Sequence, residues 1–267
     1  MRSSRRVLCV GRCFLIPPKA PTLPSIFYLK SFARFLSDTS VGRFRKTTKP
    51  RKNEVAMKEK VVPPLVLECA ARAQGFALVA GGDEAGRGPW AGPVYAAFVV
   101  LPETFILPGL DDSKKLDRNA RRRLYESIRL QAVAFGIGTA SPAEIDRINI
   151  LEATRLAFKR AFALLKPRPD YVLLDFIKLP WLKTPHEAFP KGESKSASIA
   201  AASILAKEAR DQHMEEMDRE YPGYGFARHM GYGTPAHQAA LERFGPCRIH
   251  RRSFKPIKRL IDPELPL

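Results

Sequence analysis

The chain has 267 residues and a formal charge of +18, from 45 Lys and Arg against 27 Asp and Glu. This length allows one large domain or two small ones, and a hydrophobic content of 45% excludes wholesale disorder. No apolar run approaches the ~18–20 residues of a membrane span, and the four scattered cysteines exclude a disulfide framework and paired zinc ligands. The excess of basic residues favours a polyanionic partner, most simply nucleic acid.

The first quarter of the chain carries most of this excess. Residues 1–60 hold 15 Lys and Arg and 3 acids, which accounts for +12 of the +18. An Arg-rich, Ser-containing and nearly acid-free N-terminus is typical of organelle transit peptides, so residues 1–61 are predicted to be a transit peptide and a disordered basic linker. The alternative is a nucleic-acid-binding arm. We expect a mitochondrial destination, with a plastid as the alternative, and a single globular domain at residues 62–267.

Strands and helices alternate in the globular part. In chain order, the patterns predict strands at Phe76–Ala80 and Val94–Leu101, a helix at Asp117–Leu130, a strand at Ala132–Ala140, a helix at Pro142–Leu165, strands at Tyr171–Asp175 and Glu187–Pro190, and helices at Ser198–Glu220 and Pro235–Phe244. The second helix has a clear start, because Ser141 can cap it and Glu144 completes a capping box. Leu151 and Leu164 are among its predicted inward-facing residues. Hairpin strands followed by strand–helix alternation indicate an α/β fold with a mixed sheet.

Two adjacent carboxylates, Asp83 and Glu84, follow the first predicted strand and precede a glycine-rich stretch. Neighbouring residues of a strand face opposite sides, so both can serve one site only if the strand ends or distorts there. Taken alone, the stretch is more simply an acidic turn with Arg87 as a salt-bridge partner. Asp175, at the end of another predicted strand, changes this interpretation. Carboxylates clustered at strand ends in a basic protein indicate a Mg²⁺ site.

The residues DEAGRGP at 83–89 resemble the signature of the ribonuclease HII family, the type 2 ribonucleases H. The resemblance continues in order through DSKKL at 112–116, ASPAEIDRINILEAT at 140–154, YVLLD at 171–175, KGESKSASIAAASILAKEARD at 191–211, YPGYGFARHMGYGT at 221–234 and HRRSF at 250–254. It covers roughly residues 75–260. The pattern is similar to the bacterial form of the family, which agrees with an organellar destination.

The resemblance implies a ribonuclease H-like fold, with a mixed five-stranded sheet flanked by helices and a helical C-terminal extension. It implies a metal-dependent endoribonuclease that hydrolyses RNA in RNA–DNA hybrids and cleaves on the 5′ side of ribonucleotides embedded in duplex DNA. The products would carry 5′-phosphate and 3′-hydroxyl ends. These two kinds of nucleic acid are the expected partners, no membrane is expected, and the expected oligomeric state is a monomer.

The family's four metal-binding carboxylates correspond to Asp83, Glu84, Asp175 and Glu193, which are therefore the expected catalytic residues and metal ligands. The expected cofactor is Mg²⁺ or Mn²⁺, with two ions in the catalytic complex. Two such ions can activate a water and neutralise the leaving oxygen. No histidine base is required, and the five histidines show no metal-ligand spacing.

The resemblance also implies which residues bind the substrate. Gly86, Arg87, Gly88 and Tyr232 would recognise the ribose at the RNA–DNA junction, where the 2′-hydroxyl distinguishes RNA from DNA. Phosphate contacts are expected from Ser113, Lys114 and Lys115. Arg251 and Arg252 are weaker candidates for phosphate contact, and Asp211 is expected to be a structural or supporting acid.

Two of the departures from the family pattern bear on metal or phosphate binding. Glu193 stands where Asp is usual, and its extra methylene moves the carboxylate by about 1.5 Å, although Mg²⁺ demands tight octahedral geometry. The alternative function is therefore a catalytically weakened or inactive hybrid-binding homologue. Met230 stands where Lys is usual, which removes a cation near Tyr232. A basic structural protein of organellar nucleoids or ribosomes is disfavoured, because it would not need acids at strand ends facing a polyanion.

Overall fold

The computed structural model describes residues 65–105, 109–110 and 116–262 of the chain. All of these residues belong to one compact unit. The predicted transit peptide and linker at residues 1–61 lie outside the described residues. The predicted phosphate contacts Ser113, Lys114 and Lys115 also lie outside them.

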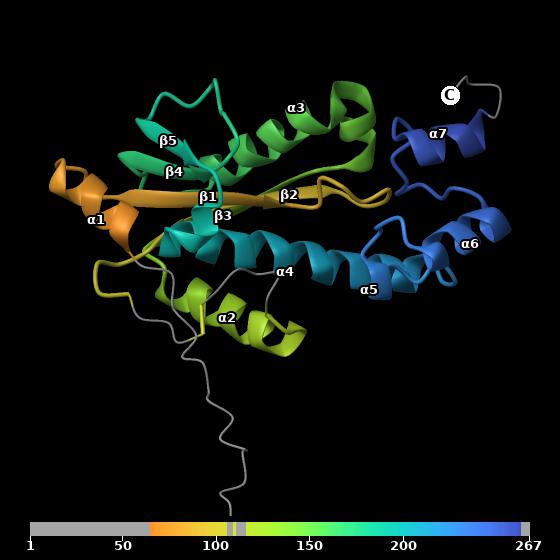
Figure 1. The fold of residues 1–267 in the computed structure, drawn as a ribbon, viewed down its shortest axis with the longest axis horizontal. Helices are drawn as coiled ribbons and strands as arrows, with labels where there is room; N and C mark the ends of the chain where they lie inside the picture. The colour runs from red at the N-terminus through yellow and green to blue at the C-terminus, as the bar shows by residue number, and fades with distance from the viewer. Residues whose placement is uncertain (1–64, 106–108, 111–115, 263–267) are drawn as a thin grey trace, which may run out of the picture. The chain divides into compact units, whose positions relative to one another are not determined.

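A mixed sheet of five strands forms the centre of the fold (Figure 1). The strands are β1 (Val79–Ala85), β2 (Val94–Val100), β3 (Ala134–Ala140), β4 (Tyr171–Asp175) and β5 (His186–Phe189). Their order across the sheet is β3-β2-β1-β4-β5. The β1–β2 and β2–β3 pairs are antiparallel, whereas β4 pairs parallel with both β1 and β5. The strands β1 and β4 therefore end at the same edge of the sheet, and the predicted mixed five-stranded sheet is confirmed.

Helices cover both faces of this sheet (Figure 1). On one face lies α3 (Pro142–Ala163), whose Phe158 packs on Phe98 of β2 with the ring centroids 5.3 Å apart. On the other face lie α4 (Ala197–Glu220) and α2 (Arg118–Gln131), which share a second hydrophobic core with β2. The sheet is thus buried on both sides, which explains the nearly continuous apolar sequence of β2.

Three further helices form an extension at the C-terminal end of α4 (Figure 1). They are α5 (Phe226–His229), α6 (Pro235–Phe244) and α7 (Lys255–Ile261), and an additional helix, α1 (Val66–Ala73), precedes β1. The extension has its own small core, which contains Met214, Tyr224, Phe226, Leu241 and Ile257. This confirms the expected helical C-terminal extension. Across the described residues, no helix has both the length and the apolar character needed to cross a membrane.

The position of the first strand differs from the prediction. The sequence predicts a strand at Phe76–Ala80, but β1 continues to Ala85. Asp83 and Glu84 are paired with residues of β2, so they lie inside a regular strand and do not follow it. The expected strand end or distortion at these two acids is therefore wrong.

Close packing explains the glycines that precede the two acids. A Cβ atom added to Gly81 would lie 2.2 Å from the backbone nitrogen of Ile199, at the start of α4. A Cβ atom added to Gly82 would lie 2.4 Å from the Phe98 ring on the opposite face. The glycines thus allow α4 and the β2 aromatic ring to approach β1 from both sides, and they do not mark a turn.

A kink interrupts α3, which the sequence predicts as one continuous helix. Asn149 has a left-handed φ of 66°, and its side-chain oxygen accepts hydrogen bonds from the backbone N–H groups of Leu151 and Glu152. Asn149 therefore caps a second helical segment. The kink changes the phase of the inward-facing pattern, so Leu151 and Leu164 are exposed, contrary to the prediction.

Candidate metal and nucleic-acid site

Three carboxylates meet at the sheet edge where β1 and β4 end. Asp83 belongs to β1, Asp175 is the last residue of β4, and Glu193 lies in a short 3-10 helix, η1 (Gly192–Ser194). One oxygen of each carboxylate lies within 4.8 Å of an oxygen of each of the other two. Asp83 and Glu193 are buried, and Asp175 is half-buried. The structure therefore brings together three of the four acids that the sequence indicates.

Local hydrogen bonds position these acids. The backbone N–H of Gly192 donates to the Asp175 carboxylate over 2.9 Å, which connects the end of β4 to η1 and places Glu193 beside Asp175. A Cβ atom on Gly192 would lie 2.7 Å from the end of the Ile199 side chain, so a larger residue here would require that side chain to move. The Asp83 carboxylate accepts hydrogen bonds from the Glu84 backbone N–H and from the side chain of Ser203 in α4.

The electrostatics of this group favour a cation. Burial raises the pKa of Asp83 well above its ordinary value, and the negative charges of Glu84 and Asp175 raise it further. Hydrogen bonds from Ser203 and from the Glu84 backbone act in the opposite direction but do not offset the burial. Clustered carboxylate oxygens are the hard donors that Mg²⁺ and Mn²⁺ prefer, so this set of residues fits a divalent metal.

Glu84, the fourth predicted ligand, lies outside this group of three. Glu84 directly follows Asp83 in a regular strand, so its side chain leaves β1 on the opposite side from that of Asp83. Its carboxylate pairs with the Arg87 guanidinium over 3.1 Å, and its side chain is 13% exposed. Glu84 is nevertheless near enough for its charge to raise the pKa of Asp83.

The predicted ribose-binding residues lie next to the carboxylates. Gly86, Arg87 and Gly88 directly follow β1, and Gly86 has a left-handed φ of 90°. A Cβ atom on Gly88 would lie 3.8 Å from the Tyr232 ring, so that ring lies over the loop although it comes from the C-terminal extension. Arg87 and Tyr232 are exposed, and 44% of the tyrosine is accessible. The structure thus brings these four predicted residues together.

Arg251 has a different role from the one the sequence suggests. It is fully buried and donates hydrogen bonds to the carbonyl oxygens of Gly86, Arg87 and Gly92, over 2.5, 2.9 and 2.9 Å. Burial, and secondarily the charge of Arg210, lowers its pKa to about 9. The suggested phosphate contact is therefore wrong for Arg251. Its guanidinium instead stabilises the loop after β1 from the buried side, through hydrogen bonds to the loop carbonyls. Its neighbour Arg252 is exposed.

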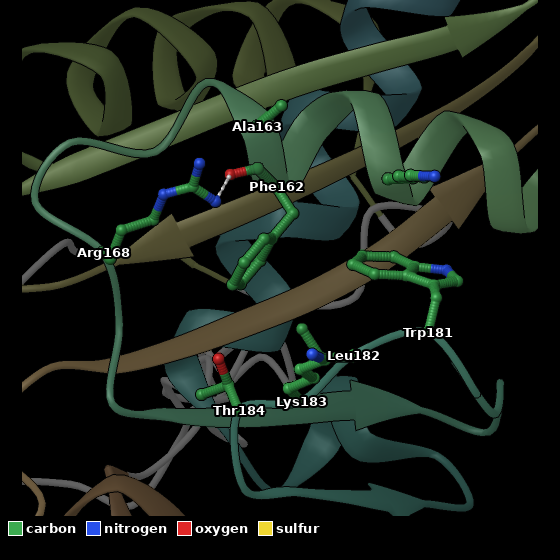
Figure 2. A pocket seen from close by; sticks show the side chains of 8 residues that line it. Phe162, Ala163, Arg168, Trp181, Leu182, Lys183 and Thr184 are labelled. Carbon is green, nitrogen blue, oxygen red and sulfur yellow. Dashed lines mark hydrogen bonds between the residues drawn. The ribbon is translucent and has the colours of Figure 1, made fainter.

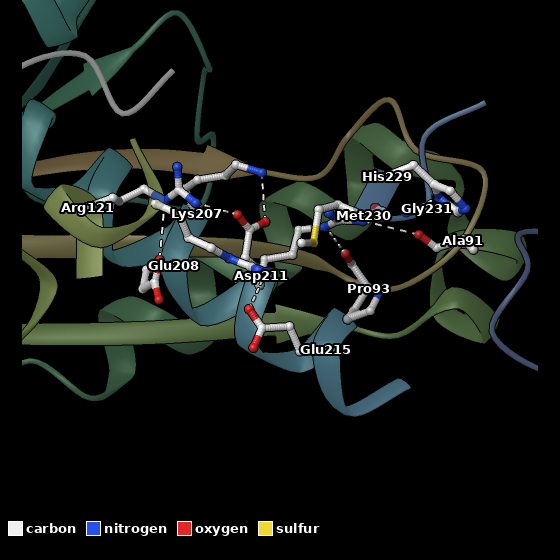
Figure 3. A network of polar contacts seen from close by, with 12 residues as sticks. Ala91, Pro93, Arg121, Lys207, Glu208, Asp211, Glu215, His229, Met230 and Gly231 are labelled. Carbon is white, nitrogen blue, oxygen red and sulfur yellow. Dashed lines mark hydrogen bonds and ion pairs between the residues drawn. The ribbon is translucent and has the colours of Figure 1, made fainter. Parts of the chain in front are cut away.

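A second buried arginine, which sequence reasoning missed, supports the same region. Arg210 of α4 donates hydrogen bonds to the carbonyl oxygens of Ala91, Pro93 and Met230 over 3.0–3.1 Å (Figure 3). Its guanidinium also lies 6.0 Å from the centre of the Tyr232 ring. The signal in the sequence is its spacing, because Arg210 falls on the buried side of α4 together with residues 203, 206 and 214.

An ion-pair network surrounds Asp211, the next residue of α4 (Figure 3). Asp211 accepts hydrogen bonds from Arg121 of α2 over 2.8 Å and from Lys207 over 2.7 Å. Arg121 also pairs with Glu208 over 3.2 Å. This network joins α2 to α4, so Asp211 is a structural acid, as expected.

A pocket of about 320 Å³ lies elsewhere, between the end of α3 and the chain that leads into β5 (Figure 2). Its lining residues are Lys159, Phe162, Ala163, Arg168, Trp181, Leu182, Lys183 and Thr184. None of the predicted site residues lines it. The carboxylates and the predicted ribose-binding residues therefore belong to a separate site at the other end of the strands.

The strand order, the helices on both faces and the acids at the strand ends define a protein of the ribonuclease H-like class. The crystal structure of ribonuclease H2 from Pyrococcus horikoshii matches with a TM-score of 0.59 and 26% identity, covering 69% of this chain and 97% of that one. The ribonuclease HII family model matches residues 80–257. The chain belongs to the ribonuclease HII family, whose members are metal-dependent endoribonucleases.

Bacterial relatives support this assignment. Ribonuclease HII of Desulfitobacterium hafniense is 54% identical over 188 residues, which cover 70% of this chain and 72% of the relative. Ribonuclease HII of Geobacillus thermodenitrificans is 49% identical over 213 residues, which cover 80% and 82% of the two chains. The resemblance noted in the sequence is thus confirmed, including its bacterial type.

Proposed function

We propose that this chain hydrolyses RNA in RNA–DNA hybrids and cleaves on the 5′ side of ribonucleotides embedded in duplex DNA, leaving 5′-phosphate and 3′-hydroxyl ends. The observation that carries the proposal is the group formed by Asp83, Asp175 and Glu193, with oxygens within 4.8 Å of one another. Acids in this position would repel a nucleic acid unless cations lay between them and the phosphates. Membership of the ribonuclease HII family supports the same activity.

Asp83, Asp175 and Glu193 would hold a divalent ion, Mg²⁺ or Mn²⁺, and Glu84 would contribute to binding a second one. When bound, such ions supply an activated water and neutralise the leaving oxygen. The protein itself positions the carboxylates through the Gly192 and Ser203 hydrogen bonds described above. Glu193 belongs to the group of three despite its extra methylene, which supports an active enzyme over a non-catalytic hybrid-binding homologue.

Selection of the substrate would fall to the loop after β1 and to Tyr232. The backbone of Gly86, Arg87 and Gly88 would approach the ribose at the RNA–DNA junction, because two of these residues lack side chains. Tyr232 would stack on the sugar and test for the 2′-hydroxyl, the group that distinguishes RNA from DNA. Ser113, Lys114 and Lys115 would contact phosphates on the basis of the family pattern alone.

The decisive test is cleavage of a DNA duplex that contains one ribonucleotide. Cleavage 5′ to that ribonucleotide is expected with Mg²⁺ or Mn²⁺, and Asp83→Asn should abolish it. Asp262→Asn, which changes an exposed aspartate outside the site, is the matched control and should cleave normally. If the protein bound the duplex but failed to cleave it with either metal, the chain would be a hybrid-binding homologue and the proposal would be wrong.

We also propose that residues 62–267 are the catalytic domain and that residues 1–61 direct it to mitochondria. The support is the charge distribution, since residues 1–60 hold 15 Lys and Arg against 3 acids. A fluorescent protein fused to residues 1–61 should enter mitochondria. Entry into plastids, or no import at all, would contradict the mitochondrial assignment, and enhanced hybrid binding by the full chain would favour the basic arm.

A further inference from the structure

Three buried histidines lie behind Tyr232 in the C-terminal extension. Their exposed fractions are 9% for His229, 0% for His237 and 2% for His250. The rings of His229 and His237 stack with centroids 4.4 Å apart, and those of His237 and His250 are 5.2 Å apart. The carboxylate site does not require them, so their burial together calls for a separate explanation.

Hydrogen bonds connect two of these rings to the backbone of Tyr232. His237 Nδ1 lies 2.9 Å from the Tyr232 carbonyl oxygen, and His237 Nε2 lies 3.0 Å from His250 Nε2. The backbone nitrogen of Cys247 lies 2.9 Å from His250 Nδ1. The Cys247 thiol and carbonyl lie farther from the same ring nitrogen, at 3.2 and 3.3 Å. The chain of contacts thus runs from Cys247 through two imidazoles to Tyr232.

The two ends of this chain determine where the ring protons are. A carbonyl oxygen only accepts hydrogen bonds, so His237 must carry its proton on Nδ1 to bind Tyr232. A backbone N–H only donates, so in the shorter contact, at 2.9 Å, His250 Nδ1 accepts from Cys247, and a neutral His250 then carries its proton on Nε2. The opposite tautomer would bond the Cys247 carbonyl over 3.3 Å and lose the shorter contact. With these two tautomers, His250 Nε2 carries a proton and His237 Nε2 does not. The single proton between the facing Nε2 atoms is therefore donated by His250 to His237. The two independent requirements agree, so the chain can be satisfied throughout.

Both imidazoles are neutral near neutral pH, which this arrangement requires. Burial lowers the pKa of His237 and of His250 to about 4. The neighbouring His229 lowers the pKa of His237 further, and His237 does the same for His250. A second proton on either ring would place two N–H groups against each other and break the contact.

The chain of contacts from Cys247 through His250 and His237 to Tyr232, here called the relay, holds one part of the backbone segment 230–232. Each carbonyl oxygen of this segment accepts a hydrogen bond. The Met230 carbonyl accepts from Arg210, and the Gly231 carbonyl accepts from the backbone nitrogen of Trp90 over 2.8 Å. The Tyr232 carbonyl accepts from His237 and from the backbone nitrogen of Thr234. The backbone that carries Tyr232 is therefore held in place, while its side chain is exposed over the loop after β1.

We propose that His237 and His250 are positioning residues that aim Tyr232 at the ribose of the substrate. The inference rests on the proposed function, in which Tyr232 recognises the RNA–DNA junction. His250 fixes the tautomer of His237, and His237 fixes the peptide of Tyr232. Neither histidine touches the substrate, so both act through the tyrosine. Their contribution is preorganisation, because a ring that is already oriented loses less entropy when it stacks on the sugar.

Matched substitutions separate the two ends of the relay. An asparagine amide nitrogen can take the place of His Nδ1, whereas a glutamine amide nitrogen lies nearer the place of Nε2. His237→Asn should therefore keep the bond to Tyr232, and His237→Gln should lose it. For cleavage of the single-ribonucleotide duplex, we expect His237→Gln to lower kcat/KM by about tenfold, the size of one hydrogen bond, and His237→Asn to lower it by less than about threefold.

His250 reverses this order. His250→Gln can still donate to His237 Nε2, whereas His250→Asn is too short to do so. His250→Gln should therefore be the milder substitution, while asparagine is the milder one at position 237. Loss of packing alone would not produce opposite preferences at these two contacting histidines, whereas loss of the hydrogen bonds would. The same preference at both positions would overturn the proposal.

A double-mutant cycle tests whether His237 acts through Tyr232. Tyr232→Ala should lower kcat/KM on its own, and adding His237→Gln should then have no further effect. If Tyr232→Ala left cleavage unchanged, the proposed role of Tyr232 would fail, and the relay with it. If both substitutions lowered kcat/KM and their effects multiplied fully, the relay would be wrong while the role of Tyr232 would stand.

The native protein offers a test without substitution. Nitrogen–proton correlation spectra of histidine-labelled protein report which ring nitrogen is protonated. We expect the Nδ1-protonated form for His237 and the Nε2-protonated form for His250 at neutral pH. The opposite tautomer at either position would overturn the proposal, whatever the variants show.

Discussion

Arg251 gives the sharpest test of how the site is supported, because the structure and the sequence assign it different roles. Its guanidinium reaches the carbonyl oxygens of Gly86, Arg87 and Gly92. In Arg251→Lys the charge remains, but one ammonium group cannot replace the fork geometry that serves three carbonyls. At least two of these oxygens would lose their donor in a buried place.

The expected cost follows from these lost bonds. An unsatisfied buried polar group costs about 1–3 kcal/mol, so Arg251→Lys should lower the free energy of unfolding by about 3 kcal/mol. For a domain of this size, that corresponds to a decrease in Tm of about 6–12 °C. Cleavage should also decrease, because the loop that carries Gly86 and Gly88 loses its support. Arg252→Lys changes the exposed neighbour and should alter stability by less than about 0.5 kcal/mol.

Thermal unfolding and a salt titration of hybrid binding distinguish the two roles, with the Arg252 variant as the control. The structural role predicts a lower Tm for Arg251→Lys only. A phosphate contact would leave Tm unchanged and would weaken binding of hybrids of any sequence, chiefly through the salt dependence. An unchanged Tm together with a changed salt dependence would therefore refute the structural reasoning.

Three further expectations concern the metal and the substrate. Glu193→Asp withdraws a carboxylate by about 1.5 Å and should raise activity with Mg²⁺ relative to Mn²⁺; an unchanged rate and metal preference in cleavage assays would contradict this. Met230→Lys restores a cation near Tyr232 and should steepen the slope of log affinity against log salt by about 0.9, whereas an unchanged slope would argue against a phosphate contact at this position. Asp83→Asn removes one of the crowded negative charges. Burial and neighbouring charges raise the pKa of Asp83, so its ionisation at neutral pH opposes folding of the metal-free protein. Without metal, Asp83→Asn should therefore have a higher Tm than the native protein. Adding Mg²⁺ should raise the Tm of the variant by less than that of the native protein. Equal melting curves for the two proteins, with and without Mg²⁺, would show that the acids do not repel one another.

Local patterns predict much of the fold. The capping box at Ser141 is present, with Glu144 bonded back to the Ser141 backbone, and Pro235–Phe244 is a helix with the predicted bounds. These features depend on residues within one helical turn, so the sequence alone contains the information. The family motifs similarly predict Asp83, Asp175 and Glu193 as neighbours, which the structure confirms.

Most of what the sequence could not predict depends on partners far along the chain. Gly81 and Gly82 look like turn residues until α4 and Phe98 are placed against them. Arg251 looks like a surface cation because its acceptors are more than 150 residues away in the sequence. The Asn149 kink is equally hidden, since its neighbours have ordinary helical spacing. For the two glycines and for Arg251, a tertiary contact overrides the local preference, whereas the kink comes from the local cap that Asn149 forms with Leu151 and Glu152.

The long separation between Arg251 and the loop it supports has a consequence for synthesis of the protein. Arg251 binds the Gly86 carbonyl across 165 positions and completes the loop that follows Asp83 and Glu84, the first two of the four predicted metal ligands. During translation, strand β1 leaves the ribosome long before this partner exists. A nascent or prematurely terminated chain that carries all four acids still lacks Arg251 and its three hydrogen bonds to the loop after β1 and to Gly92. The order of synthesis therefore makes the support of this loop one of the last contacts that the domain acquires.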